Sequence, residues 1–353
     1  MLAVESKVAR AETADSPKAN PNRSWKHIVE PLEPFLQAVM QRLIEQVNGF
    51  DPQIVPYAQY ALSGSGKHLR PTLVALAANA VGKAGDAHVN AAVIIEMVHL
   101  ATLVHDDVMD EAEIRRGRLT LAANWGNEIA VLFGDCLFAQ ALKLAASFPT
   151  PEVCRAVAMA TNTVCSGEIL QTQHRRKFLV SRHEYFRVIE MKTAELFTLS
   201  CDLAGLLGET TTEHRTALRH FGAAFGTAYQ VYDDCVDLFG SEAAAGKSLG
   251  TDLAKGKLTW PVLLAWERAN AADRAHLENL VKDWQPENFP AVNELLEKYE
   301  TFEPTREVVA RFLDQASRAL RSLPESSGRA GLSNLSDFLA QQTAALAVCV
   351  KYP

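Results

Sequence analysis

The chain has 353 residues, of which 48% are hydrophobic and 22% are charged, the balance of a globular protein with one extensive core or two ordinary domains. The formal net charge of −7 argues against a nucleic-acid partner, because phosphate backbones are bound by basic surfaces. Its six cysteines are scattered without a CxxC pair, which disfavours a zinc or disulfide framework and is typical of reduced thiols in a cytoplasm. We therefore expect a cytoplasmic protein.

The first 24 residues differ in character from the rest of the chain. They contain Glu5, Glu12 and Asp15, carry two prolines and lack an apolar stretch. A secretory signal would need that stretch, and transit peptides are usually poor in acidic residues. We predict a disordered tail over residues 1–24 and one domain over residues 25–353. No stretch approaches the ~18 consecutive apolar residues of a transmembrane segment, so none is expected.

From Trp25 onward, the apolar spacing is helical and turn residues are sparse. Periodic apolar residues and alanine-rich runs predict helices over Leu73–Val81, Val89–Val108, Ile129–Ala146 and Pro261–Ala269. No alternating β-branched pattern indicates a sheet. Glycine and proline clusters predict loops at Gly64–Gly66, Gly82–Asp86, Phe148–Pro151, Gly205–Thr212 and Gly240–Gly256. The expected fold is all-α, with a loop-rich insertion at Lys282–Thr305.

A D-D-x-x-D cluster occurs twice, each time after a strongly apolar run. The members are Asp106, Asp107 and Asp110 in the first cluster and Asp233, Asp234 and Asp237 in the second. On a helix the first and fifth residues are neighbours one turn apart, and like charges so close are costly unless a cation neutralises them. A single cluster is equally well explained as a solvated helix end. Two clusters predict facing Mg²⁺ sites that would bracket a diphosphate.

Basic residues near these clusters are candidate phosphate ligands: Lys67, Arg70, Arg115, Arg116, Lys192, Lys247 and Lys257. Each one, taken alone, is also explained as a solvated surface charge. His99 precedes Asp106 by two turns on a largely apolar helix, where a core histidine and a diphosphate ligand are equally good interpretations.

The order of the motifs resembles the trans-isoprenyl diphosphate synthases, or polyprenyl synthetases, of medium- and long-chain type. The resemblance runs from about Ser63 to Ala265 and rests on G-K-H-L-R-P, H-L-A-T-L-V-H-D-D-V-M-D, R-R-G, G-E-I-L-Q, M-K-T-A-E-L-F, Y-Q-V-Y-D-D-C-V-D, G-K-S-L-G-T-D-L and G-K-L-T-W-P. It implies a single large helical bundle around a central cavity, the isoprenoid synthase type.

The resemblance also implies a role for each site residue. Magnesium ions, three with substrate bound, would be held on the allylic diphosphate by Asp106, Asp110 and Asp233, with Asp107, Asp234 and Asp237 in or near the metal site. The same diphosphate would be gripped by Arg115, Lys192, Lys247 and Lys257, and isopentenyl diphosphate by Lys67, Arg70, His99 and Arg116. Oxygens at Thr193 and Gln230 would stabilise the developing carbocation.

The implied reaction is ionisation, condensation and elimination, which extends geranyl, farnesyl or geranylgeranyl diphosphate by five-carbon units. The resemblance places a blocking residue beneath the first cluster, and the small side chains of Ala101 and Thr102 there imply a linear all-trans product of thirty carbons or more. The resemblance further implies a homodimer, with transient membrane contact for product release. Three alternatives remain open: a twenty-carbon geranylgeranyl diphosphate synthase, a class I terpene cyclase, and a silent subunit of a heteromeric synthase.

Overall fold

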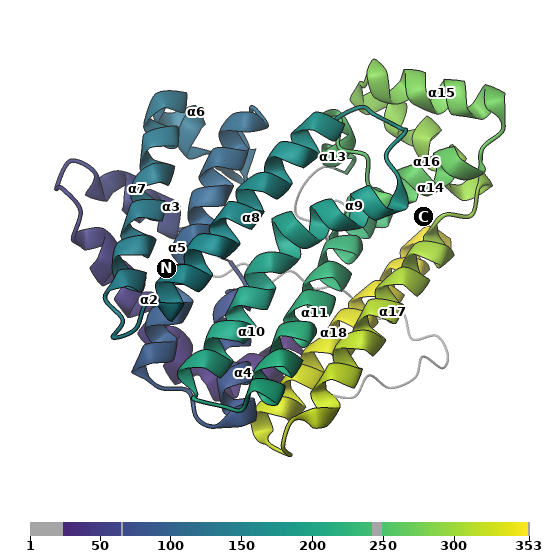
Figure 1. Cartoon of the computed structure of the whole chain (residues 1–353). Coiled ribbons are helices and arrows are strands. Elements are labelled where there is room, and N and C mark those ends of the chain that lie inside the picture. The colour runs from purple at the N-terminus through teal and green to yellow at the C-terminus, as the bar shows by residue number, and fades with distance from the viewer. Residues whose placement is uncertain (1–23, 65, 242–248, 352–353) are drawn as a thin grey trace, which may run out of the picture.

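Long helices lying side by side make up most of the computed structural model, which describes residues 24–64, 66–241 and 249–351, with side chains as far as residue 346 (Figure 1). The N-terminal part comprises α1 (Trp25–Val29), η2 (Glu30–Leu32), α2 (Glu33–Asn48), α3 (Val55–Leu62), α4 (Leu69–Val81), α5 (Asp86–Met109), α6 (Leu121–Trp125), α7 (Asn127–Ala146) and α8 (Glu152–His174). The remainder comprises α9 (Arg182–Ile189), η3 (Glu190–Ala194), α10 (Glu195–Leu207), α11 (Thr212–Phe239), α13 (Thr251–Ala254), α14 (Trp260–Arg268), α15 (Ala271–Lys282), η4 (Pro286–Asn288), α16 (Phe289–Lys298), α17 (Phe302–Ala319), η5 (Leu320–Ser322) and α18 (Ser327–Lys351).

The helices predicted from periodicity are confirmed as α4, α5, α7 and α14. Side-chain caps explain where several others begin. Ser181 accepts a hydrogen bond from the backbone N–H of Glu184 at the start of α9, and Thr211 accepts one from His214 at the start of α11. The predicted tail over residues 1–24 lies almost wholly outside the described residues, and α1 begins at Trp25.

Two parts of the chain differ from the prediction. The segment Lys282–Thr305 is not a loop-rich insertion, because α16 and the start of α17 fill most of it. An unpredicted β-hairpin joins β1 (Ile114–Arg115) to β2 (Arg118–Leu119). Strands of two residues are too short to show alternation. The turn between them has positive φ at both Arg116 (51°) and Gly117 (73°), as a type I′ hairpin requires.

The core of the bundle is built around α4, α5, α10 and α11. Phe197 on α10 and Phe221 and Phe225 on α11 are among its largest fully buried side chains, and the last two rings stack with centroids 5.7 Å apart. Each such burial contributes about 1.5–3 kcal/mol relative to exposure. The C-terminal α18 packs against α4 and α11, which ties the end of the chain to its N-terminal half (Figure 1).

Within the described residues, two helices are long and apolar enough, by length and composition, to cross a membrane. Of the most apolar window of α5, 61% is buried inside the bundle, as expected for the core helix of a globular protein. The corresponding window of α7 is only 33% buried. The apolar character of α5 is therefore explained by the core, whereas α7 presents much of its apolar surface outward.

Candidate active site

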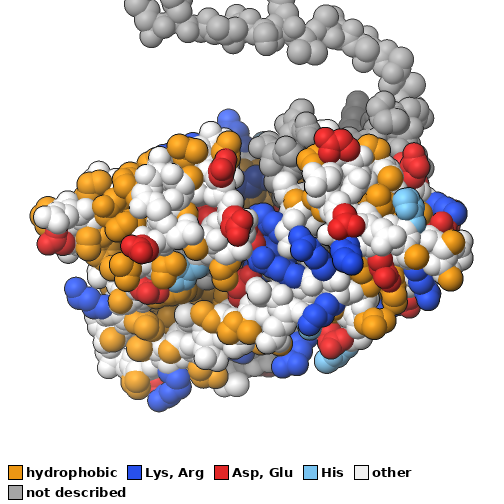
Figure 2. Space-filling model, turned by 90° about the horizontal axis from the view of Figure 1, so that it is seen from above, with side chains coloured by type: hydrophobic (Ala, Val, Ile, Leu, Met, Phe, Trp, Pro, Cys, Tyr) orange, Lys and Arg blue, Asp and Glu red, His pale blue; other side chains and the backbone are white. Residues whose placement is uncertain are grey.

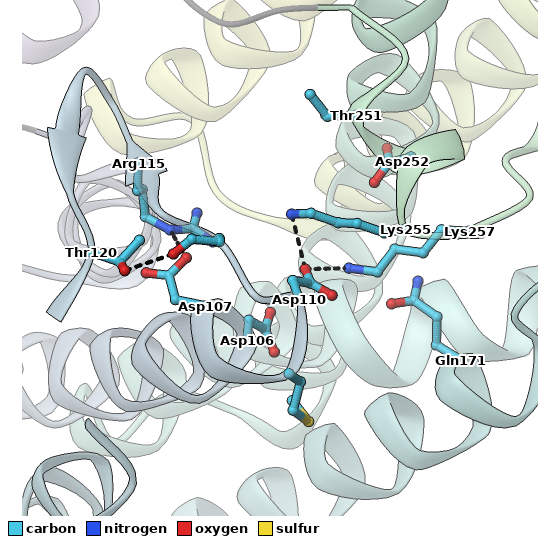
Figure 3. A network of polar contacts seen from close by, with 12 residues as sticks. Asp106, Asp107, Asp110, Arg115, Thr120, Gln171, Thr251, Asp252, Lys255 and Lys257 are labelled. Carbon is cyan, nitrogen blue, oxygen red and sulfur yellow. Dashed lines mark hydrogen bonds and ion pairs between the residues drawn. The ribbon is translucent and has the colours of Figure 1, made fainter. Parts of the chain in front are cut away.

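The first aspartate cluster lies at the C-terminal end of α5 (Figure 3). Asp106 is half-buried, whereas Asp107 points into the protein and is only 6% exposed. Arg115 on β1 reaches back so that its Nε lies 2.7 Å from Asp107 Oδ1. The unpredicted hairpin therefore has a clear local function, because it brings Arg115 to the end of α5.

Asp110 caps α5 and is surrounded by positive charge. Its Oδ1 lies 2.7 Å from Arg175 Nη2, and its Oδ2 lies 2.7 Å from Lys257 Nζ and 3.1 Å from Lys255 Nζ. Figure 3 shows both lysines reaching Asp110 from the loop that follows α13. Burial raises the pKa of Asp110, but the lysines outweigh that effect and hold it at about 2. The Asp110 carboxylate is therefore ionised, and its single negative charge is in contact with three positively charged side chains.

Lys192 is carried by η3, a π-helical turn between α9 and α10. Such turns are rare and are often found at functional sites. Glycines on both sides allow neighbouring helices to approach it closely: a Cβ at Gly167 on α8 would lie 2.7 Å from Lys192 N, and one at Gly226 on α11 would lie 2.8 Å from Ala194 Cα. The turn is therefore clamped between α8 and α11.

The Lys192 ammonium faces the first cluster. It lies 3.4 Å from Asp106 Oδ2, donates to Gln171 Oε1 at 2.9 Å and is in direct contact with the Glu168 carboxylate. Burial lowers the pKa of Lys192, but the acidic neighbours Asp106 and Glu168 prevail and the net shift is upward. Lys192 is therefore a fixed cation beside Asp106.

The second cluster, on α11, is held by hydrogen bonds in a chain. Thr193 donates to Gln230 Oε1 at 2.8 Å, and Gln230 Nε2 donates to Asp234 Oδ1 at 2.9 Å. Tyr185 donates its hydroxyl to Asp234 Oδ2. Burial is the main reason that the pKa of Asp234 rises to about 8. In this arrangement the Gln230 amide nitrogen is directed at Asp234 and its oxygen at Thr193.

The other two aspartates of the second cluster differ in exposure. Asp237 is completely buried, and its two carboxylate oxygens accept bonds from Thr251 Oγ1 at 2.6 Å, Thr251 N at 3.2 Å and Asp252 N at 3.1 Å. It thus holds the start of α13. Asp233 is half-buried.

One pocket is lined by residues that include Gln171, Tyr185, Gln230, Asp234, Lys257 and Thr259. Asp234 belongs to the second cluster, and Lys257 contacts Asp110 of the first. The pocket therefore connects the second cluster with a lysine bound to the first, while the facing of the two metal sites stays a prediction. Figure 2 shows basic side chains gathered near the centre of this face of the molecule.

A second group of cations surrounds His99 on α5. Arg70 is half-buried, with its guanidinium 4.9 Å from the Phe197 ring centroid and its Nε lacking a partner among the described residues. Burial lowers the pKa of His99 well below its usual value, and the positive charges of Arg70 and Arg116 lower it further. His99 is therefore a neutral group among arginines, and not an isolated core histidine.

The remaining predicted residues complete this picture. Arg116 lies against Gly66, where an added Cβ would be 3.0 Å from Arg116 Nη1, and Lys67 is exposed next to that glycine. Lys247 lies outside the described residues. Sequence reasoning missed Glu168, Gln171, Arg175, Tyr185 and Lys255 as site residues. Glu168 and Gln171 stand in the G-E-I-L-Q motif, whereas Arg175 and Lys255 carry no motif signal.

The predicted chain-length positions differ in surroundings. Ala101 is fully buried in an apolar cluster that includes Val104 on α5 and Phe133 and Leu137 on α7. Thr102 is half-buried, and its hydroxyl donates to the carbonyl oxygen of His99 at 2.7 Å. Thr102 is thus the more accessible of the two.

The acidic residues suit magnesium ions that are bound together with phosphates. Among the described residues, no three carboxylate, histidine or cysteine side chains already form a metal-binding group. Magnesium, however, commonly uses one or two carboxylates and completes its coordination with water and substrate phosphates. Asp106 and Asp110, which lie one turn apart on α5, match that requirement.

Comparison with known proteins agrees with this geometry. The family model described as polyprenyl synthetase matches residues 51–299, more than half of the chain. The chain belongs to the polyprenyl synthetase family. It is 33% identical to octaprenyl diphosphate synthase of Escherichia coli (strain K12) over 308 residues, which cover 87% of this chain and 95% of the relative.

Solved structures of polyprenyl synthetases have the same all-α fold. A decaprenyl diphosphate synthase from Rhodobacter capsulatus superposes with a TM-score of 0.85 at 34% identity, covering 91% of this chain and 99% of that one. A polyprenyl synthase from Caulobacter crescentus, solved with calcium and isoprenyl diphosphate, also gives 0.85 at 31% identity, covering 90% and 97%. As a polyprenyl synthetase, this chain is a prenyltransferase.

Proposed function

We propose that this chain is a magnesium-dependent enzyme that condenses isopentenyl diphosphate with an allylic diphosphate to give a linear all-trans polyprenyl diphosphate of thirty carbons or more. The observation that carries the proposal is the pair of aspartate clusters on α5 and α11, connected to one pocket through Asp234 and Lys257, with a separate group of arginines around His99. Two groups of cations suit two diphosphate substrates.

The first group would bind the allylic diphosphate. Bound magnesium, in three ions with Asp106, Asp110 and Asp233 as ligands, would polarise the phosphate oxygens and stabilise the leaving group. The protein's own cations Arg115, Lys192 and Lys257 already lie beside the first cluster and would add charge-assisted hydrogen bonds to that diphosphate. The Caulobacter crescentus relative was solved with calcium and isoprenyl diphosphate, which supports the binding of a divalent metal together with such a diphosphate.

The second group would bind isopentenyl diphosphate. Arg70 has a buried N–H without an acceptor among the described residues, which a phosphate oxygen would supply. Because His99 is neutral, it can donate one hydrogen bond to phosphate without adding charge. Between the two sites, the oriented oxygens of Thr193 and Gln230 would face the carbocation that forms when the allylic diphosphate leaves.

Product length is proposed to follow from the small residues beneath the first cluster. The direct test is to incubate the purified protein with Mg²⁺, isopentenyl diphosphate and farnesyl diphosphate, and to size the products by chromatography. Products of thirty carbons or more support the proposal. A product that stops at twenty carbons would indicate a geranylgeranyl diphosphate synthase, and an absence of elongation would contradict the proposed activity.

A pair of substitutions locates the wall of the product cavity. Because Thr102 is half-buried and Ala101 is enclosed, Thr102→Phe should shorten the product toward fifteen or twenty carbons with little loss of stability. Ala101→Phe should shorten it only at a cost of about 1–3 kcal/mol in the free energy of unfolding, because the cluster around it is already filled. An unchanged product in both folded variants would place the wall elsewhere.

A homodimer is proposed to form through the outer faces of α7 and α8. Large apolar side chains are exposed on both helices: Val131, Leu132 (61%) and Leu142 on α7, and Met159 (65%) and Ile169 on α8. A patch of this kind on neighbouring helices is typical of a protein–protein interface. Figure 2 shows hydrophobic side chains concentrated on the side where the N-terminal helices lie (left in both views).

The oligomeric state tests this interface. Light scattering should find a dimer for the wild type and a monomer for the double variant Leu132→Glu/Met159→Glu, since two buried charges per subunit would oppose association. A wild-type chain that is monomeric and inactive until a different subunit is added would instead indicate a heteromeric synthase.

A further inference from the structure

Three cations converge on the single carboxylate of Asp110, as described above, and two of them, Arg175 and Lys255, belong to none of the motifs found in the sequence. Arg175 follows the last residue of α8, and Lys255 follows the last residue of α13. One carboxylate balances only one of the three positive charges. The arrangement therefore places more positive than negative charge in direct contact at Asp110, the proposed metal ligand.

The contacts of Arg175 leave part of its guanidinium unused. Its Nη2 is paired with Asp110 and its Nη1 lies 3.4 Å from the carbonyl oxygen of Met109, while its Nε is buried and has no acceptor within the described ranges. A buried N–H without a partner is costly, typically ~1–3 kcal/mol. An anion bound beside Asp110 would give this N–H an acceptor.

The two loops that carry these cations are joined to each other. The backbone N–H of Arg176 donates to the carbonyl oxygen of Gly256 at 2.7 Å. Gly256 has φ of 69°, and a Cβ there would lie 2.7 Å from Arg176 Cγ, so glycine allows both the backbone conformation and the close approach. Arg175 and Lys255 are consequently placed by one connected structure at the end of α5.

We propose that Arg175 and Lys255 are additional ligands of the allylic diphosphate, held on Asp110 until metal and substrate arrive. The inference rests on the proposed function. A divalent ion that binds Asp110 would compete with these cations for the same carboxylate, because both oxygens are already in contact with them. The diphosphate brought in with the metal supplies oxygens that both residues can bind, Arg175 as a planar fork and Lys255 as a point charge.

Isothermal titration of the full chain with inorganic pyrophosphate in saturating Mg²⁺ tests this proposal. Arg175→Gln and Lys255→Gln should each weaken pyrophosphate binding about 10- to 100-fold, the effect of losing a hydrogen bond to a charged group. The matched control is Lys177→Gln, an exposed neighbour in the same basic run, which should change the dissociation constant less than about twofold. Arg175→Lys should recover part of the loss.

Steady-state kinetics gives a second readout. Both glutamine variants should raise KM for farnesyl diphosphate while leaving KM for isopentenyl diphosphate near its wild-type value. Pyrophosphate affinities equal to that of the wild type would overturn the proposal, because Arg175 and Lys255 would then only neutralise Asp110 in the metal-free protein. A wild-type protein that fails to bind pyrophosphate with Mg²⁺ would instead contradict the proposed function itself.

Discussion

The two aspartate clusters have the same sequence spacing but different environments. In the first, the contacts of Asp106 and Asp110 are to lysine and arginine side chains at the edge of the site. In the second, Asp234 is bonded by Tyr185 and Gln230, and Asp237 by the start of α13. A metal ion and a substrate can replace the lysine and arginine side chains that contact the first cluster. The buried hydrogen bonds of the second cluster instead hold neighbouring segments in place.

This difference shows that one motif can perform two tasks. The first cluster is suited to bind magnesium and diphosphate, because its present partners are charges that a metal can replace. In the proposed function the second cluster contributes Asp233 to metal binding, while Asp234 is bonded to Gln230 and Asp237 to the start of α13. Substitutions in the first cluster should therefore affect catalysis, and those at Asp237 should affect stability.

The largest expected effect is on turnover. Asp106→Ala should lower kcat by about 10³-fold or more in saturating Mg²⁺, because it removes a ligand from the site that stabilises the leaving diphosphate. Asp233→Ala should have a similar effect. Single-turnover and steady-state assays would measure both. Near-normal magnesium-dependent rates in either folded variant would contradict the proposal that both clusters bind metal.

A smaller effect separates the two diphosphate sites. Arg70→Ala should raise KM for isopentenyl diphosphate about 10- to 100-fold, since it removes a charge-assisted hydrogen bond. His99→Ala should act on the same substrate. Lys192→Ala should chiefly affect the allylic substrate. Kinetics with each substrate varied in turn would measure these KM values. A reversed pattern would show that Arg70 and His99 bind the allylic diphosphate and that Lys192 binds isopentenyl diphosphate.

The buried aspartate of the second cluster should matter most for folding. Asp237→Ala should lower the free energy of unfolding by about 2–4 kcal/mol, because Thr251 and Asp252 lose a buried acceptor. Urea unfolding in EDTA would measure the change, with Asp106→Ala as the control at about 1 kcal/mol or less. Equal stabilities of Asp237→Ala and Asp106→Ala would contradict the proposal that the second cluster, unlike the first, stabilises the fold.

The two clusters should also differ in how their contribution to stability depends on pH. The pKa of Asp234 is raised from 3.8 to about 8 in the folded protein, so the unfolded chain loses this proton first as pH rises. Its contribution to stability is therefore full below about pH 4 and is lost progressively up to about pH 8. Asp110, with a pKa of about 2, has the opposite sign and gains stability between about pH 2 and pH 4.

Unfolding in EDTA between pH 5 and pH 8 would measure the Asp234 contribution. The wild type should lose stability across this range more steeply than Asp234→Asn, which cannot ionise. Parallel curves for the two proteins would show that Asp234 is not protonated in the folded state.

Helical periodicity and motif spacing were sufficient to predict much of this site. The apolar runs before both clusters predict that they lie near helix ends, and the four-residue spacing predicts that the first and last aspartates of each share a face. Arg175 and Lys255 could not be predicted, because they meet Asp110 through packing between segments far apart in the chain. The π-helical turn that carries Lys192 was also missed, since it depends on tertiary contacts at Gly167 and Gly226.

The most direct test is a crystal structure of the protein with Mg²⁺ and pyrophosphate. We expect Asp106 and Asp110 to bind metal, Lys257 to move from Asp110 to the pyrophosphate, and the bonds from Thr251 to Asp237 to be unchanged. A complex in which Lys257 and Arg175 still pair with Asp110, and the metal lies elsewhere, would contradict this expectation.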